Sequence, residues 1–435
     1  MAAAERKAMN ITPSLNGFSQ KDGVWYAEGI RLTDLAEQFG TPTYVYSKKA
    51  LADAFGAYEK ACHKNGRRRA RVHYAMKANS NIAILNLFAQ LGAGFDIVSG
   101  GELARVIAAK GNPEHVVFSG VGKTETEMKD ALNAGIKCFN VESIPELTRL
   151  NEVAKRLNKK AAISLRVNPD VDAKTHPYIS TGLKGNKFGI AYDEVLPTYL
   201  AAKQMSHCEI VGIDCHIGSQ ITEINPYLDA LDRVLLLIEQ LQSQGIAIKH
   251  LDIGGGLGIC YTDETPPDIT AFANTLLDHI EQKGFAHLEI LFEPGRSLVG
   301  NAGVLLTQVE FLKPGETKNF CIVDAAMNDL MRPAMYEAYH AIVACQSNTS
   351  APQANYDVVG PICESGDWLG RDRTLQVSPG DYLAILSAGA YGFTMSSNYN
   401  TRGRAAEVMV SGQEAHLIRE RESIPSLFAL ERLVP

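Results

Sequence analysis

The side chains with the most chemical potential in this sequence lie where short apolar runs end. Lys77 follows one such run, Asp96 ends a second, and His216 closes a later one. A glycine cluster at 254–258 and then Glu293 follow the last two runs. Barrel enzymes gather their functional residues at the C-terminal ends of the strands. Each position is weak alone, but together they predict one active site.

Lys77 has the surroundings of a reactive amine. It continues an apolar segment and precedes the small residues Ala78, Asn79 and Ser80. Most lysines are solvated surface groups, but a desolvated lysine has a lowered pKa and forms an imine with an aldehyde cofactor. We therefore interpret Lys77 as the residue that carries such a cofactor as a Schiff base.

The glycine cluster and Glu293 suggest what else such a cofactor would meet. The cluster is either a flexible turn or a cradle whose backbone N–H groups bind one phosphate, and it lacks the spacing of a Walker loop. Glu293 directly follows the apolar residues Leu291 and Phe292. A carboxylate in this position needs a cationic or hydrogen-bonding partner, which a protonated pyridine nitrogen would provide. His216 is either a hydrogen-bonded core residue or a catalytic group.

A fold that brings strand ends together is needed to position these residues. Between about residues 45 and 295, eight apolar runs alternate with helical patterns such as 226–244 and 271–283. Parallel neighbours need helical crossovers, so this pattern predicts a (β/α)8 TIM barrel, with a doubly wound open sheet as the alternative. The runs are 72–75, 94–98, 116–118, 138–141, 162–167, 209–215, 250–253 and 288–292.

Several helix starts carry cap signals. The pattern Ser/Thr-x-x-Glu predicts that each side chain of the pair accepts a hydrogen bond from the other residue's backbone N–H. Pro145 fits the first turn of the last of these helices, where a missing N–H costs nothing. The pairs are Ser99 with Glu102, Thr124 with Glu127, and Ser143 with Glu146.

The sequence changes character after residue 295. Short, partly alternating runs predict an antiparallel β-sandwich or β-barrel domain, which the strand-like segments 24–26 and 43–46 are expected to join. The predicted domains are therefore 1–46 with 297–435, and a barrel over 47–296. The later runs are 304–312, 319–323, 356–359, 382–386, 406–410 and 415–418.

Composition narrows the class of protein. A net charge of −7 argues against nucleic-acid or anionic-membrane partners, which need a concentrated basic face. The eight cysteines are scattered without a C-x-x-C pair, so we expect neither a disulfide framework nor a metal site. No apolar run approaches the length that spans a bilayer, and the N-terminus has no signal-peptide core. A cytoplasmic protein is expected.

Several motifs in this chain resemble those of the alanine-racemase-like, fold-type III pyridoxal-phosphate decarboxylases. The motifs follow the family's order over nearly the whole chain, with only the first dozen residues unmatched. They are YAMKAN at 74–79, HIGS at 216–219, GGG at 254–256, EPGR at 293–296, NDLMRP at 328–333, CESGD at 363–367 and GAYG at 389–392.

The resemblance implies a role for each matching cofactor residue. Lys77 would hold pyridoxal 5'-phosphate as a Schiff base, His216 would stack on the pyridine ring, and Glu293 would keep the ring nitrogen protonated. The ring could then accept the electrons released with CO2. Further cofactor-binding residues would be Asp96, Ser219, Gly254, Gly255, Gly256, Gly295, Arg296 and Tyr391.

Cys363 lies in a stretch too polar for a core strand, although a lone cysteine is usually a small buried hydrophobe. The resemblance implies that Cys363 enters the active site of a partner subunit and delivers a proton there. Two sites made in this way require a two-fold homodimer. With Lys77 and His216, Cys363 completes the expected catalytic residues.

Within the family, the pattern most resembles the members that convert meso-2,6-diaminopimelate to L-lysine and CO2, the last step of lysine biosynthesis by the diaminopimelate route. Arg332, Tyr336 and Arg296 would bind the distal carboxylate, Glu364 the distal amine, and Tyr391 would also contact the substrate. A fixed cationic fork that binds the carboxylate, combined with an acid that binds the amine, rejects mismatched substrates strongly. The alternatives are decarboxylation of ornithine, arginine or a carboxylated polyamine, a racemase, and a non-catalytic regulatory homologue.

Overall fold

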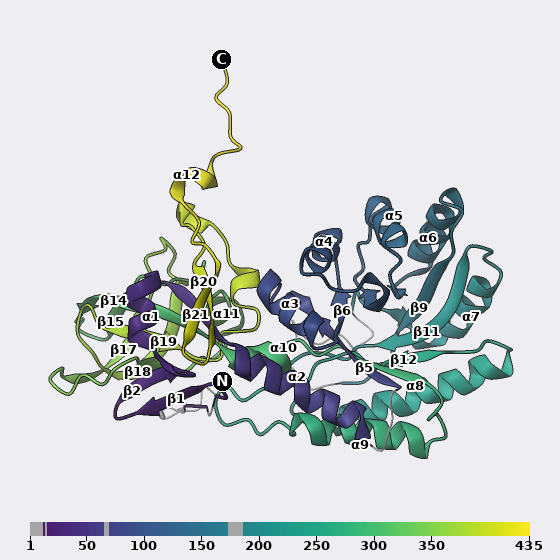
Figure 1. Cartoon of the computed structure of the whole chain (residues 1–435), viewed down its shortest axis with the longest axis horizontal. Helices are drawn as coiled ribbons and strands as arrows, with labels where there is room; N and C mark the ends of the chain where they lie inside the picture. The colour runs from purple at the N-terminus through teal and green to yellow at the C-terminus, as the bar shows by residue number, and fades with distance from the viewer. Residues whose placement is uncertain (1–11, 14, 65–68, 173–185) are drawn as a thin grey trace. The chain divides into compact units, whose positions relative to one another are not determined.

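The computed structural model describes residues 12–13, 15–64, 69–172 and 186–435 (Figure 1). Nearly all of the predicted N-terminal extension lies outside these residues. The chain forms two compact units. The barrel unit contains residues 52–259 and 265–297, and the β unit contains residues 1–51, 260–264 and 298–435. The domain boundaries predicted at residues 46 and 297 stay a proposal.

The barrel unit is built on a closed parallel sheet, so the predicted TIM barrel is confirmed and the open sheet is wrong. Each of the eight predicted runs forms a strand, and β8 pairs with β9 to close the ring. The short strand β10 (Ile190–Ala191) adds to β9. The eight strands are β5 (Ala70–Ala75), β6 (Gly94–Ile97), β7 (Val116–Phe118), β8 (Cys138–Val141), β9 (Ala161–Asn168), β11 (Cys208–Cys215), β12 (His250–Asp252) and β13 (Glu289–Phe292).

Helices follow the strands and surround the sheet (Figure 1). Their apolar faces are buried, as a crossover helix requires; in α8, for example, Leu231, Val234 and Leu241 are buried. The helices are α2 (Lys48–Cys62), α3 (Ile82–Gln90), α4 (Gly100–Ala108), α5 (Glu125–Ala134), α6 (Ile144–Arg156), α7 (Tyr192–Lys203), α8 (Asn225–Ser243), α9 (Ile269–Gln282) and α10 (Arg296–Val299). Of these, α2 and α10 cross the boundary between the two units.

Only one of the three predicted capping boxes is complete. Thr124 and Glu127 exchange both hydrogen bonds at the start of α5. At α4 and α6 the cap serine accepts its bond, but the glutamate accepts from the residue before the cap. Glu102 accepts from the N–H of Val98, and Glu146 from the N–H of Glu142. The helix starts are therefore right, and the reciprocal half of the box is wrong at these two helices.

The β unit was predicted to be antiparallel, and it contains a mixed sheet. Most pairs are antiparallel, but β15 runs parallel to β17 and β4 runs parallel to β20. The predicted addition of segment 43–46 is confirmed, because β4 pairs with both β14 and β20. Its strands are β4 (Thr43–Ser47), β14 (Gly303–Lys313), β15 (Asn319–Val323), β16 (Ile342–Ala344), β17 (Gln353–Val359), β18 (Trp368–Gln376), β19 (Tyr382–Ile385), β20 (Ala406–Ser411) and β21 (Glu414–Arg419).

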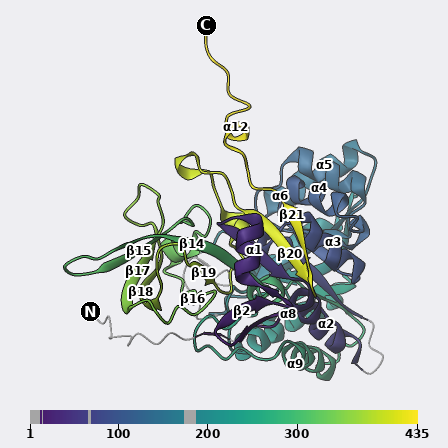
Figure 2. The ribbon, with the colours of Figure 1, turned by 60° about the vertical axis from the view of Figure 1, so that its left-hand side comes forward.

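Segment 24–26 joins the β unit but not its large sheet. It lies in β2 of a small antiparallel sheet formed by β1 (Phe18–Lys21), β2 (Val24–Ala27) and β3 (Ile30–Arg31). Strands β15, β17 and β18 lie side by side in the large sheet (Figure 2). The helices of this unit are α1 (Leu32–Phe39), α11 (Arg332–Tyr336) and α12 (Ile424–Leu427).

The core of the β unit is formed by one face of α1 and the inward side chains of the strands. Leu32 and Leu35 of α1 pack with Val45, Val304 and Val408, and all five are fully buried. Among the described residues, no helix has the length and apolar composition needed to cross a bilayer.

Candidate active site

The predicted reactive lysine lies at the C-terminal end of the barrel strands. Lys77 is in a single turn of 3-10 helix directly after β5, and its Nζ is 2.5 Å from Oδ2 of Asp96 on the adjacent strand β6. Asp96 is fully buried as a side chain, while the Lys77 side chain is 37% exposed. Lys77 is therefore ion-paired and partly exposed, and its predicted role as the cofactor-binding lysine stays a prediction.

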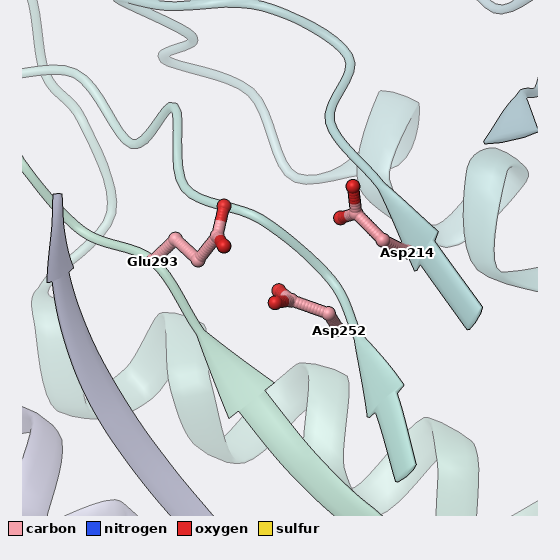
Figure 3. A group of neighbouring side chains, drawn as sticks. All are labelled: Asp214, Asp252 and Glu293. Carbon is pink, nitrogen blue, oxygen red and sulfur yellow. The ribbon is translucent and has the colours of Figure 1, made fainter. Parts of the chain in front are cut away.

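Three buried carboxyl groups gather at the same end of the barrel. Asp214 lies near the end of β11, Asp252 ends β12, and Glu293 follows β13. Figure 3 shows the three side chains pointing toward one another, and their carboxyl oxygens lie within 4.8 Å of one another. Each keeps one buried oxygen without a hydrogen-bond partner among the described residues.

The buried position of these three carboxyl groups disfavours their ionised forms. Burial, followed by the charges of neighbouring acids, raises the pKa of Glu293 and Asp214 well above their usual values. Burial raises the pKa of Asp252 to about 7. Lys77 is near enough that its charge opposes this shift at Glu293. The cluster would therefore favour a cationic group placed against it.

A buried arginine lies between Asp214 of the cluster and Glu142, which follows β8. The Nη1 of Arg166 on β9 donates to Oε1 of Glu142 at 3.0 Å, and its Nε lies 3.9 Å from Oδ2 of Asp214. Glu142 also accepts from the N–H groups of Gly120 and Gly189. Arg166 thus supplies positive charge to the acidic end of the barrel from a fixed position.

His216 follows β11, and Gly255 holds its ring. The N–H of Gly255 donates to Nδ1 of His216 at 3.2 Å, so that nitrogen carries no proton. Burial and the positive charges of Arg166 and Lys77 lower the pKa of His216 well below its usual value. His216 is therefore a neutral imidazole at the C-terminal end of the barrel strands.

The glycine cluster is built for close approach of backbone to backbone. An added Cβ at Gly255 would lie 2.0 Å from the carbonyl oxygen of Glu293, and one at Gly256 would lie 2.4 Å from the carbonyl oxygen of Gly218. The N–H of Gly254 donates to Asp252, and that of Gly255 to His216. Because these two N–H groups bond to other residues of the chain, Gly254 and Gly255 would contribute to a cofactor site mainly by allowing the backbone segments around it to pack closely.

A buried guanidinium and a hydroxyl meet in the loops that follow β11 and β13. Arg296 begins α10, is only 6% exposed, and its Nη2 donates to Oγ of Ser219 at 3.1 Å. Gly295 packs against the turn that carries Lys77, since an added Cβ would lie 3.1 Å from the carbonyl oxygen of Ala75. A buried guanidinium next to a hydroxyl is a suitable anion site.

These features fit pyridoxal phosphate. Lys77 supplies an accessible amine for the aldehyde, and the partnerless oxygen of Glu293 is an acceptor for a protonated ring nitrogen. Arg296 and Ser219 supply donors for the phosphate. All of these residues belong to the barrel unit and follow its parallel strands at one end.

The other predicted site residues belong to the β unit. Cys363 and Glu364 are exposed in the loop between β17 and β18. The N–H of Cys363 donates to Asn400 at 2.8 Å, and Glu364 accepts from the hydroxyl of Tyr399 at 3.3 Å. The polar loop predicted around Cys363 is thus confirmed, and its thiol is presented to the outside of this chain.

Arg332 and Tyr336 lie at the two ends of α11. Arg332 is 7% exposed, and Tyr336 is half-buried. Tyr391 follows β19 and has a φ of 55°, a left-handed conformation that is uncommon for an aromatic residue. Such backbone strain is concentrated at ligand sites. The roles predicted for these residues stay predictions.

Sequence reasoning missed Asp214, Asp252 and Arg166. The signal was available, because a charged residue near the end of an apolar strand must be paired or neutralised. Glu293 was found by this argument, while Asp214 in CEIVGIDC and Asp252 in HLD were read only as strand residues.

Comparison with known proteins shows the family of this chain. Residues 50–300 match the family model described as pyridoxal-dependent decarboxylase, pyridoxal binding domain. The chain is 57% identical to diaminopimelate decarboxylase of Vibrio cholerae over 416 residues, which are 96% of this chain and 98% of that protein.

Solved structures extend the likeness to three dimensions. Diaminopimelate decarboxylase from Helicobacter pylori in complex with L-lysine matches with a TM-score of 0.87 and 42% identity, covering 92% of this chain and 98% of that one. The M. jannaschii enzyme in complex with L-lysine matches with a TM-score of 0.90 and 41% identity, covering 97% and 98%. The chain therefore belongs to the diaminopimelate decarboxylase family of pyridoxal-dependent decarboxylases.

Proposed function

We propose that this chain removes one carboxylate from meso-2,6-diaminopimelate to give L-lysine and CO2. The observation that carries this proposal is that an accessible lysine and a buried carboxylate cluster occur at the same end of the barrel. The chain is also 57% identical to such an enzyme over 96% of its length. Bound pyridoxal phosphate supplies the electron sink that accepts the electron pair released with CO2.

The barrel residues would bind and tune the cofactor. Lys77 holds it through its amine and Glu293 keeps a proton on the ring nitrogen. Neutral His216 packs against the ring without adding charge. A larger group binds the phosphate or fixes the loops around it, and consists of Ser219, Gly254, Gly255, Gly256, Gly295, Arg296 and Tyr391.

The residues of the β unit would choose the substrate and complete the reaction. Arg332 and Tyr336, with Arg296, bind the distal carboxylate of the substrate, and Glu364 binds its distal amine. Tyr391 contacts the substrate as well. The thiol of Cys363 delivers a proton to the carbon that has lost CO2. Support for this role comes from its exposure in a loop whose backbone is fixed by Asn400.

The assembly proposed with this function is a homodimer in which Cys363 acts in the active site of the partner chain. A two-fold dimer would place one such thiol in each of two sites. We also propose that the protein works in the cytoplasm, where thiols stay reduced, because all eight cysteines are free.

Parallel turnover assays test the proposed substrate. The purified protein, loaded with pyridoxal phosphate, is given meso-diaminopimelate, ornithine and arginine in separate reactions, and released CO2 is measured. We expect rapid release from meso-diaminopimelate and rates at least about 1,000-fold lower from the other two, because a site built for a polar group rejects analogues that lack it. Rapid release from ornithine with none from meso-diaminopimelate would overturn the proposal.

A further inference from the structure

Arg332 contacts two aromatic side chains of the β unit, those of Tyr261 and His340. Its guanidinium carbon lies 4.5 Å from the centre of the Tyr261 ring, and its Nη1 lies 2.8 Å from Nε2 of His340. The rings of Tyr261 and His340 meet edge to face at 5.3 Å. All three residues are nearly inaccessible, with exposures of 7%, 5% and 0% for Arg332, Tyr261 and His340.

The contacts of His340 determine its proton. Its Nδ1 lies 2.8 Å from the carbonyl oxygen of Leu386, which can only accept a hydrogen bond, so Nδ1 carries the hydrogen. A guanidinium can only donate, so Nε2 accepts from Arg332 with its lone pair. His340 is therefore neutral in this arrangement. It fixes the orientation of Arg332 without neutralising the guanidinium charge.

Both supports of Arg332 are themselves held in place. The N–H of Leu386 donates to the carbonyl oxygen of Ala341, which ties the residue after His340 to the end of β19. In the segment of Tyr261, the carboxylate of Glu264 accepts from the N–H groups of Tyr261 and Thr262. Hydrogen bonds that involve the backbone therefore fix both the segment of Tyr261 and the segment of His340.

We propose that His340 and Tyr261 are positioning residues that set the specificity for a substrate with a distal carboxylate. They hold the planar guanidinium of Arg332 in one orientation, and a preorganised fork loses less freedom when it binds a carboxylate. This inference rests on the proposed function, in which Arg332 binds the distal carboxylate. That carboxylate remains in the product, where it is the only carboxylate of L-lysine.

The contribution of this carboxylate to binding can be measured by comparing two ligands. L-lysine and 1,5-diaminopentane have the same chain and the same two amines, and differ only in the carboxylate. Binding of each to the protein loaded with pyridoxal phosphate is measured from the change in visible absorbance. We expect His340→Leu to weaken L-lysine binding about tenfold or more, since hydrogen bonds to charged groups are of that strength. Binding of 1,5-diaminopentane should be unchanged.

Two further variants separate positioning from a general structural role. His340→Gln should restore most of the L-lysine affinity, because its amide can accept from Arg332 and donate to Leu386. Tyr261→Leu, in a different segment, should repeat the selective loss. Equal loss of both ligands in His340→Leu, or no rescue by His340→Gln, would overturn the inference. If the unmodified protein fails to prefer L-lysine over 1,5-diaminopentane, the distal-carboxylate role of Arg332 fails first.

Discussion

At the scale of residues, the main feature of the site is the protonation of three buried carboxyl groups. Asp214, Asp252 and Glu293 are buried together, and their pKa values are raised mainly by burial. A cation placed against Glu293 would lower its pKa again and keep its carboxylate ionised. Cofactor binding and the protonation of this cluster are therefore coupled.

Replacement of Glu293 by glutamine should separate this charge from the shape of the site. Glu293→Gln keeps the size of the side chain, but its amide cannot hold a proton on the ring nitrogen. Turnover should fall by about 100-fold or more, a typical loss when one stabilising group in an active site is removed. Glu289→Gln in β13, the strand that precedes Glu293, is the control, because Glu289 pairs with the partly exposed Lys137. Equal effects of the two changes would contradict the role of Glu293.

The cluster also predicts how the stability of the cofactor-free protein depends on pH. The pKa of Asp252 is about 7 in the folded protein, against about 3.9 in an unfolded chain. The folded state therefore binds more protons between these values, so the contribution of Asp252 to stability falls as pH rises from about 4 to about 7 and then levels off. The melting temperature of the cofactor-free protein should fall between pH 5 and pH 8, and Asp252→Asn should reduce this fall by about 2 °C or more. An unchanged slope would show that Asp252 is ionised in the folded state.

At the scale of elements, the loop after β12 contacts residues on both sides of the proposed cofactor site. Its glycines approach the carbonyl oxygens of Glu293 and Gly218 more closely than any side chain would allow. The same loop contacts His216 through the N–H of Gly255. A displacement of this loop would move both His216 and Glu293.

A single methyl group should disrupt this arrangement. In Gly255→Ala the new Cβ would lie 2.0 Å from the backbone oxygen of Glu293, which cannot rotate away. The affinity for pyridoxal phosphate, measured by equilibrium absorbance titration, should fall about tenfold or more. Gly56→Ala in α2 is the matched control, because nothing lies within 4 Å of its added Cβ. It should keep full affinity, and an unchanged affinity in Gly255→Ala would contradict this account of the loop.

The barrel strands and most strands of the β unit could be predicted because each carries its own local pattern. The apolar runs and their spacing were sufficient for all eight barrel strands. Strand β16 (Ile342–Ala344) was missed because it is only three residues long, and β18 (Trp368–Gln376) because its LGRDR stretch is rich in charge. The parallel pairs β15–β17 and β4–β20 join distant segments, which no local pattern reveals.

The candidate site was predicted only where one residue was unusual in its own context. Lys77, His216 and Glu293 each follow an apolar run, and the comparisons place the chain in a family that fits them. The ion pair of Lys77 with Asp96 and the support of Arg332 by His340 depend on side chains that meet only after folding. No spacing in the sequence could reveal these contacts.

At the scale of the whole molecule, the proposed homodimer makes a prediction that does not depend on any interface detail. Lys77→Ala and Cys363→Ala chains should each have little activity alone. If Cys363 acts in the partner's site, a mixed dimer contains one intact site formed from the two unmodified residues. Random exchange makes half of the dimers mixed, so mixing equal amounts should restore about a quarter of full turnover.

The measurement is turnover of meso-diaminopimelate after subunit exchange, with the dimer confirmed by light scattering. Cys363→Ala alone should keep the visible absorbance of the bound cofactor, because the thiol acts on the substrate. Restored activity supports a shared site. If mixing restores nothing although exchange has occurred, Cys363 acts within its own chain or has no catalytic role.

The central claim is that this chain decarboxylates meso-diaminopimelate with a cofactor held by Lys77. The most direct test is to measure L-lysine formed from meso-diaminopimelate by the purified protein and by Lys77→Ala, both supplied with pyridoxal phosphate. The unmodified protein should form L-lysine and CO2 in equal amounts, and Lys77→Ala should form neither and lack the visible absorbance of the bound cofactor. Absence of L-lysine from the unmodified, cofactor-loaded protein would contradict the account, as would full activity in Lys77→Ala.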